Sequence, residues 1–137
     1  MKRAVALAVG ATLATALTAG AADKPKKPTL ELRVAPRMAF SPVTALFTAE
    51  LKGGDDVEEF YCPEVEWEWD DGGKSVQESD CPPFEAGVKL ERRFTGTHEY
   101  RRAGSYTIRI TLRRTGNAFA AQSVRLAVRP GLADPSE

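Results

Sequence analysis

The sequence predicts an all-β protein, an antiparallel β-sandwich of about seven strands. Short segments in which apolar and polar residues alternate recur along the chain, and this period of two is typical of strands with one buried and one solvent-facing side. Clusters of Gly, Pro, Asn and Asp, which favour turns, separate these segments at short intervals. The sequence shows no helical periodicity and no internal repeat, and 137 residues fit one domain.

Residues 1–21 are predicted to be a secretory signal peptide. Lys2 and Arg3 give it a positive start, and Ala4–Thr18 is an uncharged stretch rich in Ala, Leu and Val. Residues 19–21 (Ala-Gly-Ala) fit the small-x-small pattern of a cleavage site. Because the apolar run is too short and too rich in alanine to favour a retained membrane helix, we expect a secreted or periplasmic protein without a membrane span.

The rest of the chain is predicted to hold a flexible leader over residues 22–29, a sandwich domain over residues 30–129 and a disordered tail over residues 130–137. The full chain carries 19 basic and 19 acidic residues, so it offers no concentrated basic surface for nucleic acid. We therefore expect no nucleic-acid partner, and we expect a monomer.

The first two predicted strands lie before a loop. Leu30–Val34 alternates three aliphatic residues with Glu and Arg, and Val43–Leu51 alternates apolar residues with Thr and Glu. The second of these is predicted to be central in its sheet, and Pro36 and Pro42 bracket an irregular link between them. Lys52–Glu59 breaks the pattern and is predicted to be a surface loop.

The next segments surround a predicted tight turn. Val65–Trp69 has an apolar residue at every second position, and residues 71–72 (Asp-Gly) supply the turn after it. Lys74–Ala86 is polar and contains two prolines, so a loop or a poor edge strand is expected. Val88–Phe94 is predicted to be a short or edge strand, because Arg92 falls on the side that should be buried.

The last two predicted strands form a hairpin. Tyr106–Leu112 and Val124–Val128 show the cleanest alternation in the chain. Arg113–Ala118 lies between them and contains Thr-Gly-Asn, which favours a hairpin connection.

The chain contains an ordered set of aromatic, histidine, aspartate and glycine residues: Trp67, Trp69, Asp71, Gly72, His98, Tyr100, Gly104 and Tyr106. This set resembles the motif of the PKD domain, an immunoglobulin-like β-sandwich found in many exported proteins. Within the Trp-Asp-Phe-Gly-Asp-Gly part of that motif, Glu68 replaces Asp, Trp69 replaces Phe and Asp70 replaces Gly. The resemblance covers Leu30–Val128. It implies an immunoglobulin-like fold and a module that serves as an interaction or spacer unit.

We expect these motif residues to be structural. Trp67 can fill the centre of a thin two-sheet core, and Tyr106 fits the tyrosine-corner position of immunoglobulin-like sandwiches. His98 is the only histidine, but catalysis by histidine needs a nucleophile and an orienting acid beside it. A hydrogen-bonded structural histidine in the turn is the simpler expectation.

Cys62 and Cys81 are the only cysteines. An even count in an oxidising compartment predicts one structural disulfide, and free thiols, buried or metal-binding, are the alternative. The bond would connect the segment before the Trp67 strand to the segment after its turn. Closing such a loop should stabilise the fold by about 3 kcal/mol.

Outward-facing charges mark a candidate binding face: Glu66, Glu68, Arg109, Arg113 and Arg125. Their strands would be neighbours in an immunoglobulin-like sheet, so this face is either a solvated set of ion pairs or a docking face for a protein or glycan. Acidic residues give a weak calcium prediction at Asp55, Asp56, Asp70 and Asp71. It is weak because the Asp-x-Asp-x-Asp spacing is absent, and we expect no cofactor.

The sequence therefore predicts an exported, non-catalytic binding module for a protein or carbohydrate surface. An inhibitor or accessory subunit of a secreted enzyme is the alternative among binding proteins, with Lys52–Tyr61 or Lys74–Phe84 as its exposed rigid loop. A small hydrolase with paired carboxylates is the alternative of a different class. It would need a cleft that holds two acids, one of them with a raised pKa.

Overall fold

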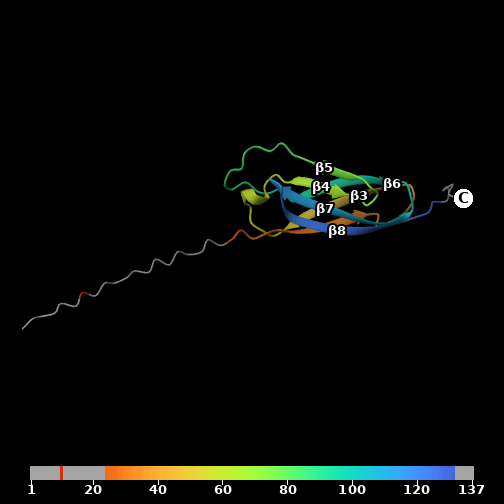
Figure 1. The fold of residues 1–137 in the computed structure, drawn as a ribbon, viewed down its shortest axis with the longest axis horizontal. Helices are drawn as coiled ribbons and strands as arrows, with labels where there is room; N and C mark the ends of the chain where they lie inside the picture. Colours follow the sequence, from red (N-terminus) through yellow and green to blue (C-terminus); the bar gives the residue numbers. More distant parts are fainter. Residues whose placement is uncertain (1–9, 11–23, 132–137) are drawn as a thin grey trace, which may run out of the picture.

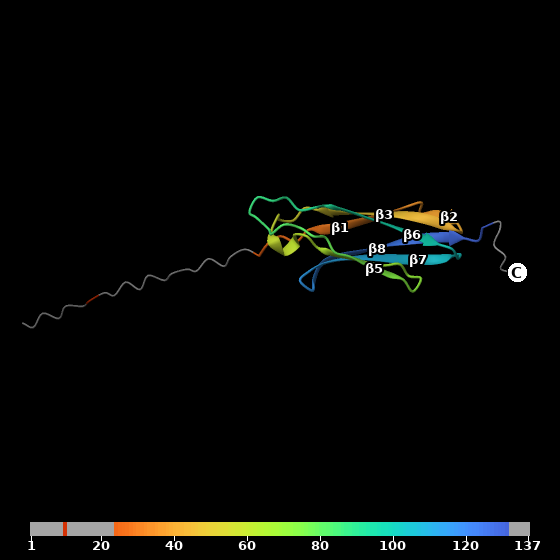
Figure 2. The ribbon, with the colours of Figure 1, turned by 90° about the horizontal axis from the view of Figure 1, so that it is seen from above.

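Two β-sheets pack face to face (Figure 1, and edge-on in Figure 2). The computed structural model describes residues 24–131 and Gly10. The rest of the predicted signal peptide and residues 132–137 of the predicted tail lie outside the described residues, so the limits of signal peptide, leader, domain and tail stay predictions. Within the described residues, no helix is long and apolar enough to cross a lipid bilayer.

The described residues form eight strands and one short 3₁₀ helix, with these bounds: β1 (Thr29–Ala35), β2 (Met38–Phe40), β3 (Val43–Lys52), η1 (Glu58–Phe60), β4 (Glu64–Glu68), β5 (Lys74–Gln77), β6 (Arg93–Tyr100), β7 (Gly104–Arg114) and β8 (Asn117–Arg129). One sheet has the order β1-β3-β6 and the other the order β2-β8-β7-β4-β5. The predicted all-β, immunoglobulin-like sandwich is confirmed. The second predicted strand is central in its sheet, and Lys74–Ala86 supplies an edge strand and then a loop, as expected.

The core lies between the sheets and contains the apolar side of each long strand. Trp67 and Trp69 stack with ring planes 4° apart, and the ring of Phe47 packs 6.0 Å and 5.3 Å from their centroids. Gly96 lies against both indoles, because a Cβ atom there would come within 3.0 Å of Trp67 and 3.1 Å of Trp69. The core also contains these fully buried residues: Ala45, Ala49, Ile108, Ile110, Leu112 and Leu126.

The link between β1 and β3 contains a strand that the sequence does not predict. β2 pairs in parallel with the last residues of β8, so the sandwich is not purely antiparallel. The N–H of Ala127 donates to the carbonyl oxygen of Arg37 (3.1 Å), and the N–H of Ser41 donates to that of Arg129 (2.8 Å). A strand of three residues between two prolines is too short to show a pattern, and only its partner in β8 defines it.

The strand predicted over Val88–Phe94 is wrong in its first part, because β6 includes only its last two residues. Leu90 is buried, but its N–H donates to Oδ1 of Asp56 (3.2 Å) instead of to a neighbouring strand. Arg92 donates to the carbonyl oxygen of Gly53 (2.7 Å). The loop after β3 therefore provides the partners that a sheet would otherwise supply.

The β7–β8 hairpin turns at Thr115 and Gly116, which both have positive φ (47° and 80°). This conformation is typical of two-residue hairpin turns, and the predicted connection over Arg113–Ala118 is confirmed. β8 begins well before the predicted Val124–Val128. Its first half, Asn117–Ser123, pairs with β7 but is too rich in small residues to show alternation.

Candidate functional site

The residues of the PKD-like motif gather at one end of the sandwich, around the β4–β5 turn. His98 lies on β6 and not in a turn, and its ring stacks on Trp69 with planes 4° apart and centroids 4.5 Å apart. Nε2 of His98 lies 2.6 Å from Oδ2 of Asp71. The hydroxyl of Tyr100 donates to the carbonyl oxygen of Trp69 (2.8 Å). We call this cluster the motif end.

Burial and hydrogen bonding act in opposite directions on Asp71. Burial raises the pKa of its carboxyl group, but hydrogen bonds from His98 and from the N–H of Gly73 outweigh burial, so the pKa is lowered. Burial, followed by the negative charge of Asp71, raises the pKa of the Tyr100 hydroxyl. Asp71 is therefore ionised and Tyr100 neutral near neutral pH, which keeps both in fixed hydrogen-bonding roles.

The departure from the PKD motif at Asp70 fits its backbone. Asp70 has a φ of 64°, a left-handed conformation that favours Gly and that Asp tolerates better than most residues. Its Oδ2 accepts a hydrogen bond from the N–H of Thr107 (2.8 Å), which ties the turn to β7. Beside it, Tyr106 donates to the carbonyl oxygen of Arg102 (2.7 Å), the contact of a tyrosine corner.

The geometry of His98 supports a structural role. Among the described residues, its only side-chain hydrogen bond is to Asp71. Its ring lies between the rings of Trp69 and Tyr100, with a centroid 4.9 Å from that of Tyr100. These contacts hold the ring in place, and the structural role of His98 stays a prediction.

The predicted binding face lies on the outer side of the five-stranded sheet, where β4, β7 and β8 are neighbours as expected. Glu68 is directly opposite Arg109, and Arg125 is directly opposite Thr107, and all four residues are exposed. The face is therefore charged and accessible along β7 and β8.

Glu66 differs from the expectation for this face, because it is only 8% exposed. Lys74 Nζ lies 3.2 Å from Oε1 of Glu66, and Arg113 Nε lies 3.7 Å from its Oε2. The long stems of these two basic side chains cover the carboxylate, so a side chain that points away from the core is still buried. Glu66 and Arg113, both predicted for the binding face, therefore already form ion pairs within the protein.

The four aspartates that weakly predict a calcium site lie in two separate places. Asp55 and Asp56 lie in the loop after β3, where Arg92 forms an ion pair with Asp56 (3.2 Å). Asp70 and Asp71 lie in the β4–β5 turn and have the partners described above. Within residues 24–131, no three His, Cys, Asp or Glu side chains are grouped so as to hold a metal ion. Calcium binding remains a prediction.

The predicted disulfide is present at the other end of β4. Cys62 and Cys81 are bonded, with Cα atoms 6.2 Å apart. Next to it, the hydroxyl of Tyr61 donates to the carbonyl oxygen of Pro82 (2.7 Å), and the ring of Tyr61 packs edge-on against Phe84. These contacts fasten the loop after β5 to the segment before β4.

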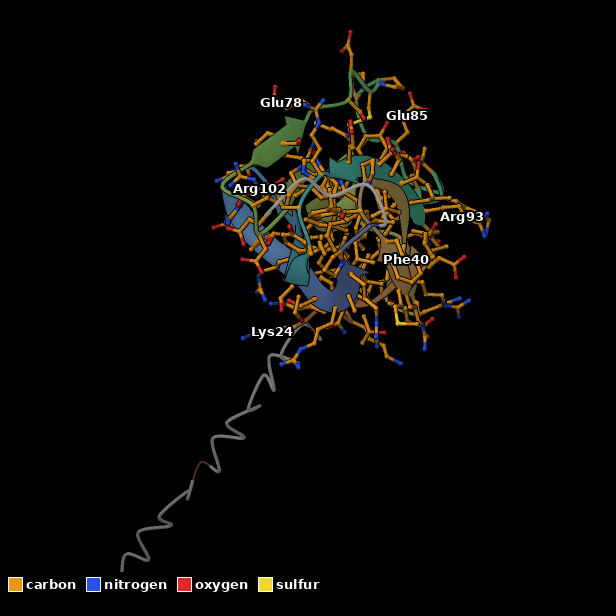
Figure 3. The ribbon with its side chains drawn as sticks, turned by 90° about the vertical axis from the view of Figure 1, so that its right-hand side faces the viewer. Lys24, Phe40, Glu78, Glu85, Arg93 and Arg102 are labelled. Carbon is orange, nitrogen blue, oxygen red and sulfur yellow. A yellow bond between two sulfur atoms is a disulfide. The ribbon has the colours of Figure 1, made fainter. Side chains whose placement is uncertain are left out.

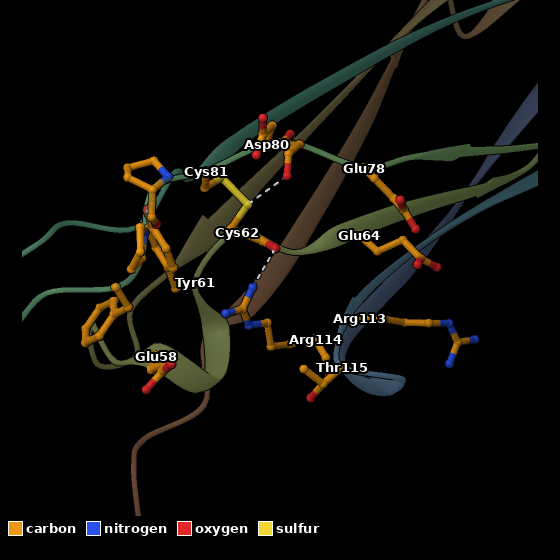
Figure 4. Close-up of a pocket in the computed structure, with 14 residues that line it drawn as sticks. Glu58, Tyr61, Cys62, Glu64, Glu78, Asp80, Cys81, Arg113, Arg114 and Thr115 are labelled. Carbon is orange, nitrogen blue, oxygen red and sulfur yellow. Dashed lines mark hydrogen bonds between the residues drawn. A yellow bond between two sulfur atoms is a disulfide. The ribbon is translucent and has the colours of Figure 1, made fainter.

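A pocket of about 460 Å³ opens to solvent beside the disulfide (Figure 4), and we call it the disulfide pocket. Four acidic residues line it: Glu58, Glu64, Glu78 and Asp80. Two arginines also line it, but both are engaged by the protein. Arg114 lies over the ring of Tyr61 and donates to the carbonyl oxygen of Cys62 (3.4 Å), and Arg113 approaches Glu66.

The sequence predicts only part of this pocket. The two loops predicted as rigid and exposed, Lys52–Tyr61 and Lys74–Phe84, both contribute to its lining. The contribution of Arg114 and Thr115 from the β7–β8 hairpin is not predictable, because no local pattern shows that this hairpin turns beside the disulfide.

No protein-family model and no curated protein matches this sequence. The structure does match solved domains. One is the PKD domain of an M14-like peptidase from a Thermoplasmatales archaeon, with 16% sequence identity and a TM-score of 0.54, over 80% of this chain and 100% of that one. The fold is PKD-like. A CARDB domain from Pyrococcus furiosus, solved with di-metal ions, matches with 10% identity and a TM-score of 0.47, over 77% of this chain and 97% of that one.

The PKD-like fold agrees with the resemblance seen in the sequence. It places the motif end and the disulfide pocket at opposite ends of β4. The motif end consists of packed and hydrogen-bonded groups, and the disulfide pocket presents polar groups to solvent.

Proposed function

We propose that this protein is an exported, non-catalytic binding module that recognises a protein or carbohydrate surface through the disulfide pocket. The observation that carries the proposal is a charge-lined pocket whose walls are braced by the Cys62–Cys81 bond and by Tyr61. A braced site loses less conformational entropy when a partner binds. Loops at the end of a rigid sandwich are also the usual recognition elements of immunoglobulin-like folds.

Export rests on two supports. Residues 1–21 have the pattern of a signal peptide, and the disulfide fits an oxidising compartment. The mass of the protein recovered from periplasm or medium tests this part of the proposal. A chain that starts at Ala22 supports export, and a full-length chain confined to the cytoplasm contradicts it.

The acids of the pocket also favour a second candidate, the hydrolase with paired carboxylates. Such an enzyme needs one carboxyl group that is protonated at working pH, and burial is the usual way to achieve this. Glu58, Glu78 and Asp80 are exposed, and Glu64 is only partly buried. We therefore place binding above hydrolysis. Release of reducing sugar from glycans by the wild type, but not by Glu64→Gln, would reverse that order.

The experiment for binding is a pull-down with residues 22–137 from envelope and culture fractions, with a glycan array beside it. A stoichiometric complex with one secreted enzyme would identify an inhibitor or accessory subunit, and binding to an envelope protein or glycan would identify a module. In either case the bound partner is then titrated against three charge reversals.

The three variants separate the possible binding faces. Glu78→Lys alters the pocket, Glu85→Lys alters the same loop outside the pocket lining, and Arg125→Glu alters the outer sheet face. We expect affinity to fall about tenfold or more only for Glu78→Lys. A loss only for Arg125→Glu would move the site to the sheet face, and equal affinity in all three would contradict the pocket.

A further inference from the structure

We propose that two copies of this chain associate through the open edge of β6, in an antiparallel register that places Arg93 of one copy opposite Glu99 of the other. The proposal is independent of the disulfide pocket. It differs from the monomer that the sequence alone led us to expect.

Among residues 24–131, β6 has a partner strand on one side only. It pairs with β3 along its whole length, from Arg93 opposite Glu50 to Tyr100 opposite Val43. No strand of the described residues pairs with its other edge. An unpaired edge presents a row of N–H and C=O groups that can bind another strand.

The pairing of β6 with β3 determines which residues of β6 point their backbone N–H and C=O groups to the open edge. The N–H of Leu51 donates to the carbonyl oxygen of Arg92 (2.8 Å), and the register continues from there without a shift. Bonded and non-bonded pairs alternate in an antiparallel ladder, so the even-numbered residues of β6 bond to β3. Residues 93, 95, 97 and 99 therefore direct their backbone groups to the open edge.

The other edge strands of the two sheets are shorter or covered. β2 and β5 have three and four residues. β1 has seven, but the side chain of Gln122 on β8 donates to the carbonyl oxygen of Leu30 (3.3 Å) on that strand. β6 has eight residues, no proline and no bulge. It thus lacks the shortness, prolines and bulges that natural proteins use to block edge pairing.

The exposed side of β6 is complementary to itself when two copies run antiparallel. If Gly96 faces Gly96 of the second copy, Arg93 faces Glu99 and Thr95 faces Thr97, each pair occurring twice. These four residues are the ones whose backbone groups face the open edge, so side-chain pairing and hydrogen bonding select the same register. A shift by two residues in either direction loses both charge pairs. A two-fold symmetric contact of this kind closes as a dimer.

Existing ion pairs do not oppose this arrangement. Arg93 lies 2.8 Å from Glu50, and Glu99 lies 3.2 Å from Arg101. The Arg93 side chain is 70% exposed and projects away from the sandwich (Figure 3). In the dimer, Glu50, Arg93, Glu99 and Arg101 alternate in sign across the contact. Each charge keeps its present partner, and Arg93 and Glu99 gain a second one.

Sedimentation velocity of residues 22–137 tests the association directly. Because a strand-edge contact is small, we expect a weak, reversible dimer that becomes populated between about 10 µM and about 1 mM protein. A wild-type protein that stays monomeric over this whole range would overturn the proposal.

Charge exchange tests the register. Arg93→Glu or Glu99→Arg alone places like charges opposite each other and should weaken the dimer about tenfold or more. The double variant Arg93→Glu/Glu99→Arg restores opposite charges and should recover most of the affinity. Arg33→Glu, an equivalent reversal on the outer face of β1, should have no effect. A double variant as weak as the single variants would contradict the register.

Thr97→Pro tests the edge itself. It removes an N–H that points to the open edge and leaves the β3 ladder intact, a position where edge strands tolerate proline. We expect a monomer whose near-ultraviolet circular dichroism matches the wild type. A folded Thr97→Pro variant that still dimerises would overturn the proposal, and if this variant does not fold, the charge variants decide.

Discussion

The two ends of the sandwich are held together by different means. At the motif end, Trp69 is stacked on His98, and Tyr100 donates to a backbone carbonyl from a buried position. At the other end, one covalent bond, Cys62–Cys81, fastens loops whose polar side chains remain in solvent. The first end gains its rigidity by burying its side chains, and the second gains it without burying them.

The contrast between the two ends indicates where function is to be sought in the molecule. Several residues that make the fold recognisable have side-chain polar groups that are already hydrogen-bonded within the protein, as the contacts of Asp71 with His98 and of Tyr100 with Trp69 show. The disulfide pocket keeps acidic groups available because a cross-link replaces the packing that would otherwise cover them. A motif that identifies the fold therefore need not identify the binding site.

The largest expected effect concerns the motif end and its adjoining core. Trp67→Ala removes a fully buried indole that packs on Phe47 and Trp69, so unfolding free energy should fall by about 3–5 kcal/mol. Urea denaturation followed by circular dichroism measures it. A loss below about 1 kcal/mol would show that the motif end does not depend on side-chain packing for its rigidity.

The second effect concerns the cross-link. The double variant Cys62→Ala/Cys81→Ala should lower stability by about 3 kcal/mol, the value for a loop of this size. Hydrogen exchange should increase mainly in residues 78–84, while β7 stays protected. An equal increase at the β4–β5 turn would mean that the two ends are not independently braced.

The third effect is the pH dependence of the motif end. The folded-state pKa of Asp71 is lowered, so its contribution is present above the unfolded value of about 3.9 and is lost as pH falls through the folded value. Asp71→Asn should cost about 1–2 kcal/mol at pH 7 and should flatten the loss of stability below about pH 4.

Urea denaturation of wild type and Asp71→Asn across this pH range measures the effect. Asp56→Asn is the control, because Asp56 also has a lowered pKa but lies far from the motif end. The hydrogen bond from the N–H of Leu90 lowers this pKa most, and the charge of Arg92 lowers it further, while burial acts in the opposite direction. His98 ring signals in nuclear magnetic resonance should shift with Asp71→Asn and not with Asp56→Asn. Equal acid sensitivity in wild type and Asp71→Asn would mean that the ionised Asp71 carboxylate does not stabilise the fold.

The smallest expected loss of stability comes from a variant that removes the hydrogen bond of Tyr61 but keeps the packing of its ring. Tyr61→Phe keeps the ring against Phe84 and removes the bond to Pro82, so stability should fall by about 1 kcal/mol or less. The loss is small because the disulfide still holds the loop. Thermal unfolding measures it, and a loss as large as that of the cysteine double variant would mean that Tyr61 is the main brace.

The sequence predicts those elements whose signal is local. Leu30–Val34, Val43–Leu51 and Tyr106–Leu112 alternate over their own length, so each is predicted close to its observed limits. Local alternation predicts neither the existence of β2 nor the burial of Glu66. β2 exists only through its pairing with β8, and Glu66 is covered by Lys74 from β5 and Arg113 from β7.

The disulfide pocket is an intermediate case. Its cysteines and loops are evident in the sequence, because cysteine count and broken periodicity are local features. The acids from η1, β4 and the loop after β5 converge only after the sheet has formed. The same holds for Arg114, which reaches Cys62 from the far end of β7.

The parallel pairing of β2 with β8 has a mechanical consequence. The described chain enters the sandwich at one end and leaves it at the other (Figure 1), with β1 continuing into β2 and β8 running beside it in the same direction. Tension between Lys24 and Gly131 therefore pulls these two strands past each other and loads their hydrogen bonds together, in shear, instead of one after another. In single-molecule stretching, Ala39→Pro should lower the unfolding force, because it removes a bond from the middle of this short clamp. The parallel pairing of β2 with β8 therefore predicts a higher resistance to stretching along the long axis than to pulling the same strands apart from one end.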